Sequence, residues 1–379
     1  MSAERDAGRP TLYNRKDARR SLVIAGTAMP QHRRLPIAAA ALLLLAAAGY
    51  TGFWFFEAHL VRSGLADWTA ARRAEGLSVD YGAPQLSGFP FRIAVRLDHP
   101  AVAAPEQHWR WTGEAVEADV RPWAFHHVTV HPLGRQEVAF VAAGENAVAS
   151  ASAAEATAVV DVDARGRLQE GSFDAEALTL AGAGGPPALV ARSVHLELAG
   201  PGDAPAAGKG PALPLSAVLS LRLAEVTLAS AAGSPLGPTL GSLALEAQVR
   251  GPFEGKSPMQ ALTAWRDAGG TLELHSFALA WGPLQLAGNA TLALDPNLQP
   301  EGAGTGEIRG FAETIDALVG QGLVKPDTGA LAKAALGLLA KAPAGGGAKV
   351  LTVPLTIQKQ VLYAGPFGLM RLPTIKWAG

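Results

Sequence analysis

The segment LPLSAVLSLRLAEVTLAS, residues 213–230, decides the fold class. Apolar residues occupy positions 215, 217, 219, 221 and 223, and the alternation resumes one position out of phase at Val226 and Leu228. A period of two places one kind of side chain on one face of a β-strand. Because a one-residue change of phase is produced by a β-bulge or a sharp bend, we expect such a feature at Ala224–Glu225.

Other segments repeat this pattern and predict a sheet with one apolar face. Residues 271–281, TLELHSFALAW, change phase in the same way between Leu274 and Phe277. Residues 89–97 place five apolar side chains on one face, with Arg92 and Arg96 on the other. Long strands that bend while one face stays apolar predict a mainly β fold with a long, strongly curved antiparallel sheet.

The composition fits such a fold and argues against several functional classes. Of 379 residues, 49% are hydrophobic and 17% are charged, against about 25% charged in ordinary soluble domains. The 43 Gly and 27 Pro suit short strands joined by turns. A net charge of −1 provides no field for nucleic acid, and the absence of Cys excludes disulfides and thiolate chemistry. This composition favours a β-rich binding protein or scaffold over an enzyme.

Residues 36–56, PIAAAALLLLAAAGYTGFWFF, form one uncharged apolar run. As a helix, the run would be ~31 Å long, about one hydrocarbon thickness. Eight basic and three acidic residues precede it, whereas residues 57–76 hold three of each. The positive-inside rule therefore predicts a single-pass anchor with its N-terminus in the cytoplasm.

These signals divide the chain into four parts. We expect a basic tail at 1–34, a transmembrane anchor at 35–56, a juxtamembrane helix at 57–76 and a β-rich domain at 77–379. Two alternatives remain open: a cleaved signal peptide processed at AAAG (46–49), and a true start at Met29. Residues 35–379 hold 24 basic and 30 acidic residues, which argues against a polybasic membrane-surface role.

Three short helices interrupt the strands. Ser257 as N-cap and Pro258 at the first position begin a helix that ends at Gly269, and residues 311–343 contain two more. Three short helices are too few to cover a dozen strands. Either the sheet curls on itself, or part of its apolar face forms a groove for an apolar ligand.

Motifs of catalysis, metal binding and phosphate binding fail on spacing. In HHVTVH (126–131), His127 and His131 would lie ~13 Å apart along a strand, too far to share one Zn²⁺. GPFEGKS (251–257) is one residue short of a phosphate-binding loop. The glycine clusters at 182–185, 302–306 and 345–347 are interpreted as turns. We therefore expect no catalytic, metal-binding or cofactor-binding residues.

Aromatic and branched residues are the remaining candidates for a site. HWRWTG places Trp109 and Trp111 on one strand face, where they are core or interface aromatics, or else line an acyl-chain pocket or a partner-docking surface. The candidate residues of an apolar groove or docking surface are Phe89, Phe91, Trp109, Trp111, Leu219, Leu221, Leu223, Phe277 and Trp281.

Several segments resemble the domain-of-unknown-function 2125 family of exported proteins in Gram-negative bacteria. They are the anchor ending GFWFF, LSGFPFRIAV (86–95), LTAWRDAGGTLEL (262–274), WGPLQLAG (281–288) and LYAGPFGLMRLP (362–373). Some relatives carry a Cys pair bracketing the GFPFR strand, and this chain has no Cys there. The C-terminal pattern is also similar to that of AsmA-like proteins, which implies an inner-membrane anchor and a periplasmic curved sheet involved in lipid movement.

Two functional hypotheses follow. In the first, a membrane-anchored periplasmic protein binds or passes lipid acyl chains along an apolar curved sheet, with phospholipid as its partner. In the second, the chain is a non-catalytic envelope scaffold that docks another envelope protein. Neither involves an enzyme, a cofactor or nucleic acid.

Overall fold

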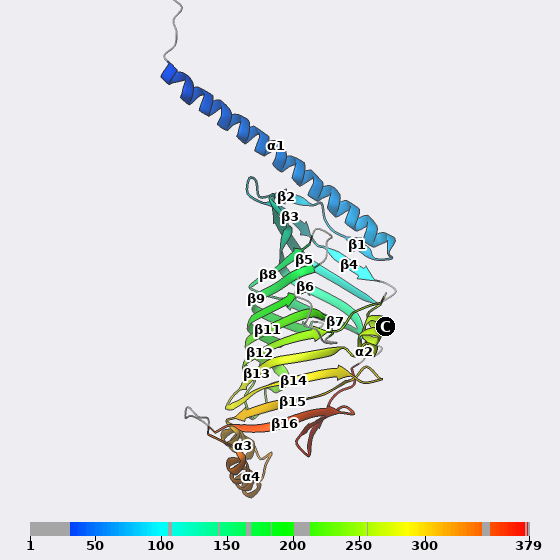
Figure 1. Ribbon diagram of the computed structural model, residues 1–379, viewed down its shortest axis with the longest axis vertical. Helices are drawn as coiled ribbons and strands as arrows, with labels where there is room; N and C mark the ends of the chain where they lie inside the picture. The colour runs from blue at the N-terminus through cyan, green and yellow to red at the C-terminus, as the bar shows by residue number, and fades with distance from the viewer. Residues whose placement is uncertain are drawn as a thin grey trace, which may run out of the picture. The chain divides into compact units, whose positions relative to one another are not determined.

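The computed structural model shows a mainly β protein with one long antiparallel sheet and four α-helices (Figure 1). The structure describes residues 31–104, 108–142, 145–163, 168–182, 184–200, 213–255, 257–342, 349–375 and 377. The expected basic tail at 1–34 therefore lies almost entirely outside the described residues. The chain divides into two compact units, Met1–Phe53 and Trp54–Gly379, and the sheet belongs to the second.

Helix α1 (Gln31–Ala74) contains both the predicted anchor and the predicted juxtamembrane helix. The expected continuation of the apolar run as helix is confirmed, and the helix ends two residues before Gly76, whose φ is +89°. Residues Ala39–Ala74 are long and apolar enough to span a membrane. The chain thus has one candidate transmembrane helix near its N-terminus.

The first half of the sheet contains ten strands. They are β1 (Ser78–Asp80), β2 (Gln85–Ser87), β3 (Ile93–Asp98), β4 (Ala101–Ala104), β5 (Trp109–Arg121), β6 (Ala124–Ala142), β7 (Glu145–Ser152), β8 (Glu155–Val162), β9 (Leu168–Gly182) and β10 (Pro187–Ala199). Strands β3 and β4 pair side by side with β5, and β7 and β8 together fill the place between β6 and β9.

The second half is a meander in which each strand pairs with the next. Its strands are β11 (Leu215–Leu228), β12 (Thr239–Arg250), β13 (Thr271–Trp281), β14 (Leu284–Leu294), β15 (Pro300–Arg309), β16 (Leu351–Gln358), β17 (Val361–Ala364) and β18 (Phe367–Arg371). The short 3₁₀ helix η2 (Ala229–Ala231) follows β11.

The predicted feature at Ala224–Glu225 is a bend rather than a bulge. Glu225 has a φ of +48°, yet β11 keeps its register with β10 and β12 on both sides of it. On β9, Ala177 has a φ of +50° and faces the same point of β10, so neighbouring strands bend together. The phase change at 274–277 is a bulge, because β13 shifts register there against both neighbours.

The three short helices lie where the sequence predicts them. Ser257 caps α2 (Pro258–Asp267) by accepting a hydrogen bond from the Gln260 backbone N–H. Helices α3 (Phe311–Gly320) and α4 (Pro326–Leu339) form a hairpin between β15 and β16. Buried Trp265 attaches α2 to the sheet by donating from Nε1 to the Arg250 carbonyl at 2.8 Å and stacking on Phe253.

Two predictions about local structure are wrong. Strand β3 begins at Ile93, and Phe89 and Phe91 lie in the preceding turn, where Gly88 has a φ of +99° and Pro90 has no N–H for the sheet. The glycine cluster at 302–306 is not a turn but the middle of β15. Every second residue there is glycine, which is a strand period.

We predict that Trp265→Ala lowers the free energy of unfolding by ~3–5 kcal/mol, because the change removes a buried ring and its hydrogen bond. Denaturant unfolding of the full chain in mild detergent measures the loss. The matched control is Trp123→Ala, because Trp123 is 61% exposed and should cost less than ~0.5 kcal/mol. Equal losses in the two variants would contradict the packing described for α2.

Candidate functional site

The apolar face of the sheet is the largest candidate site. Pairing in register joins one apolar residue from each of ten strands into a single line across the sheet, here named the central row. In order along the sheet it consists of Leu86, Val95, Ala118, Val130, Ala158, Phe173, Leu196, Leu221, Leu245 and Phe277. All but the buried Val95 are half-buried. The face is thus apolar without being sealed from solvent.

Two parallel rows widen this surface. Leu219 lies between Leu198 and Ala247, and Leu223 lies between Val194 and Leu243. The structure therefore places Leu219, Leu221 and Leu223 in three adjacent rows and brings Phe277 into the row of Leu221. These four candidates lie on one continuous face.

One end of the central row starts at a small buried core around Trp54. Trp54 of α1 packs with Ala58 and Ile93, and Leu86 lies against this core. The Trp54 Nε1 donates to the Arg92 carbonyl at 2.9 Å, and the Trp54 ring meets the Phe89 ring edge-on with 5.4 Å between centroids. Phe91 remains 71% exposed in the same turn. The row therefore begins beside Trp54 and Phe89.

An apolar cavity of about 160 Å³ lies at the other end of the row. Phe277, Leu274, Leu292, Leu355, Ile357 and Leu362 supply its larger side chains, and Gly302, Gly304 and Ala290 supply small ones. Small-molecule sites typically measure ~300–1,000 Å³. The cavity fits the end of an apolar chain better than a compact ligand.

Glycine residues shape this cavity, and sequence reasoning missed them. A Cβ at Gly302 or Gly304 would collide with the backbone carbonyl of Thr291 or Asn289, and one at Gly288 would collide with Thr305 and the Phe277 ring. Only glycine allows so close an approach of β13, β14 and β15. The glycines alternate at 302, 304 and 306, and that period was the signal that could have identified them.

The other aromatic candidates lie elsewhere. Trp109 and Trp111 occupy the same side of β5 as Glu117 and Asp119, whereas the central row passes through Ala118. They therefore face away from the apolar rows, opposite Phe140 and Val138. Trp281 ends β13, where its Nε1 donates to the Gly237 carbonyl at 2.8 Å.

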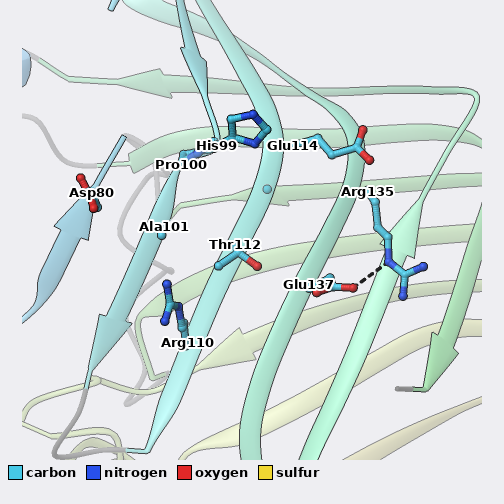
Figure 2. A pocket seen from close by; sticks show the side chains of 10 residues that line it. Asp80, His99, Pro100, Ala101, Arg110, Thr112, Glu114, Arg135 and Glu137 are labelled. Atoms are coloured by element: carbon cyan, nitrogen blue, oxygen red, sulfur yellow. Dashed lines mark hydrogen bonds and ion pairs between the residues drawn. The ribbon is translucent and has the colours of Figure 1, made fainter. Parts of the chain in front are cut away.

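A larger, polar hollow of about 400 Å³ lies among β1, β4, β5 and β6 (Figure 2). Its charged lining residues have both signs: Arg110 and Arg135 against Asp80, Glu114 and Glu137. Arg135 is paired with Glu137 at 2.7 Å, the dashed line in Figure 2. The charged lining residues of the hollow are thus close to balanced in number.

The clustered histidines pair with neighbouring strands. His127 Nδ1 lies 2.9 Å from Asp161 Oδ1, and His131 Nδ1 lies 3.1 Å from Thr157 Oγ1. Within the described ranges, no group of three or more His, Asp or Glu side chains is arranged to hold a metal ion. These contacts belong to the polar face of the sheet.

His195 is the most strongly held of the polar-face histidines. Its Nδ1 lies 2.6 Å from Asp174 Oδ1 and its Nε2 lies 3.0 Å from Glu197 Oε1. The hydrogen bond to Asp174 raises the pKa of His195, burial opposes this, and the hydrogen bond to Glu197 adds to it. Arg222 faces the same imidazole from β11. The imidazole therefore lies between Asp174 of β9 and Glu197 of its own strand, β10.

The chain belongs to the family described as "Uncharacterized protein conserved in bacteria (DUF2125)", which matches residues 54–373. The match covers the sheet and its helices, together with the end of α1 from Trp54. No curated protein and no solved structure matches the chain.

We predict that stability falls as the pH rises from about 6.5, the unfolded-state pKa of histidine, through the raised native pKa of His195. The stabilisation is fully present below that range, where the imidazole is charged in both states, as long as the carboxylates stay ionised. Thermal unfolding of the full chain in detergent across this range measures the slope. His195→Gln should flatten it, whereas His126→Gln, at an exposed position on β6, should not. An unchanged slope in His195→Gln would contradict the assignment.

Proposed function

We propose that this member of the DUF2125 family is a non-catalytic, inner-membrane-anchored periplasmic protein that holds or passes lipid acyl chains along the apolar face of its sheet. The single observation that carries the proposal is the central row, which is apolar on every strand from Leu86 to Phe277 and half-buried along nearly all its length. The expected AsmA-like character of the C-terminal half belongs to the same proposal.

The central row is long enough to hold an extended acyl chain. Ten paired strands at ~4.8 Å each span ~43 Å, more than the ~30 Å hydrocarbon core of a bilayer. Shielding a chain from water is worth about 0.8 kcal/mol per CH₂. A chain that moves from a bilayer to an apolar face keeps most of that shielding, so both entry and exit remain feasible.

The two ends of the row support a direction of passage. Trp54 lies near the end of the apolar run 36–56, with Phe89 and Phe91 in the turn beside it, and aromatic rings prefer the headgroup region. The excess of basic residues before the helix supports a cytoplasmic N-terminus. We infer that lipid enters at this aromatic cluster and that the chain ends reach the cavity beside Phe277.

Photocrosslinking tests the proposal at neighbouring residues on opposite faces. A photoreactive residue at Leu221 should capture labelled phospholipid in membranes that contain the full chain. At Arg222, on the opposite face, capture should be at least about tenfold lower, because that face is charged. Equal capture at both positions, or none at Leu221, would refute lipid binding by the sheet.

The alternative is a scaffold that docks another envelope protein. Trp109, Trp111, Phe140 and Val138 form an aromatic patch on the face away from the central row, and Phe140 and Val138 are exposed. Aromatic patches of this kind favour protein contacts. If this alternative holds, an in-cell crosslinked complex should disappear in Trp109→Ala/Trp111→Ala while Leu221 captures no lipid.

A further inference from the structure

Helix α4 is apolar on nearly all sides, including the side that it turns to solvent. Its residues Ala330, Leu331, Ala334, Ala335, Leu338 and Leu339 are all exposed, and they share one helical face. Leu331 is 72% exposed, Leu338 87% and Leu339 67%. A helix on the surface of a soluble domain normally turns polar residues to water. The outer face of α4, from Ala330 to Leu339, therefore requires a covering that the chain itself does not supply within its described part.

The inner face of α4 carries the half-buried Ala332 and Leu336 together with the close-packed Gly329 and Lys333. Lys333 pairs with Asp316 of α3, with Nζ 2.6 Å from Oδ1. Gly329 is buried, and a Cβ there would press on Val319 and Ile315 of α3. These contacts fix the orientation of the helix, so the leucines cannot turn inward without breaking them.

The charges around this face differ in sign from the rest of the exported chain. Residues 311–350 hold four Lys and three carboxylates, whereas residues 35–379 as a whole are acidic. Lys325 precedes α4, and Lys341 and Lys349 follow it; all three are exposed. The Lys349 Nζ donates to the Gly337 carbonyl, which holds its charge beside the C-terminal end of the helix. Lysines therefore flank the leucines at both ends.

This chemistry fits a lipid surface better than a protein surface. Protein interfaces concentrate Trp, Tyr and Arg and are depleted in Lys. Between Ala330 and Leu339 the outer face of α4 has only Ala and Leu. Asp327 lies one turn earlier on the same face, and three Lys lie beyond the two ends. Interfacial helices combine an apolar face with Lys side chains that reach anionic headgroups.

We propose that the outer face of α4 inserts into the surface of a bilayer that contains anionic phospholipid. The α3–α4 hairpin lies between β15 and β16, and β15 is ten strand pairings along the sheet from β3, which packs against Trp54. At ~4.8 Å per strand this is ~48 Å of sheet. The hairpin is thus a membrane contact separate from α1. This proposal does not rest on lipid binding by the sheet.

The absence of native Cys makes a fluorescence test direct. The full chain with Leu338→Cys carries an environment-sensitive label and is reconstituted into vesicles of phosphatidylethanolamine and phosphatidylglycerol. A lipid with a quencher on its acyl chain is placed either in these vesicles or in a second, added population. Quenching in either arrangement supports insertion and identifies the bilayer that is contacted. The matched control is Glu313→Cys, an exposed polar position on α3, which should not be quenched.

A double variant on the outer face of α4 tests whether its leucines cause the quenching. Leu331→Ser/Leu339→Ser in the labelled chain should weaken quenching by about tenfold or more, because each change removes exposed apolar surface without touching α3. Absence of quenching in both arrangements would overturn the proposal. So would energy transfer between labels on different copies that occurs without quenching, because it would make a second copy of the chain the occupant.

Discussion

A sheet with one apolar face must have that face shielded from water, and the rest of this molecule depends on how the constraint is met. The apolar rows run without interruption from the strand beside Trp54 to the glycines of β15. Helices α2, α3 and α4 are too short to cover them. Within the described residues the rows stay half-buried, and a bound apolar chain would complete their shielding.

Bends and small residues produce this surface. Glu225 and Ala177 adopt left-handed backbone conformations at one level of the sheet, so neighbouring strands turn together and keep their pairing. Glycines on β14 and β15 let the strands approach closely beside Phe277. Hydrophobic patterning thus sets which face is apolar, and a few backbone positions set where space is left on it.

Patterning predicted strands at 213–230 and 271–281, a bulge or bend near Glu225, a second phase change before Phe277 and the three short helices, because each has a local signal. Patterning could not show whether the apolar side chains of two separate strands lie on the same face of the sheet. Trp109 and Leu221 both follow period-two patterns, and only the register through β6 to β10 shows that their faces are opposite. A glycine cluster usually signals a turn, and only the period of two at residues 302, 304 and 306 indicates that these glycines belong to a strand. The exposed face of α4 also escaped, since composition alone does not say which side of a helix is packed.

Native mass spectrometry of the full chain, released from detergent, tests the central claim most directly. If the sheet holds lipid, a phospholipid mass is retained in the wild-type chain and in Arg222→Asn/Glu246→Asn, which alters only the polar face. That mass should be lost in Leu221→Asn/Leu245→Asn, two residues of the central row, with the fold verified by circular dichroism. Lipid bound equally to both variants would assign it to α1 rather than the sheet, and a lipid-free wild-type chain would contradict the account.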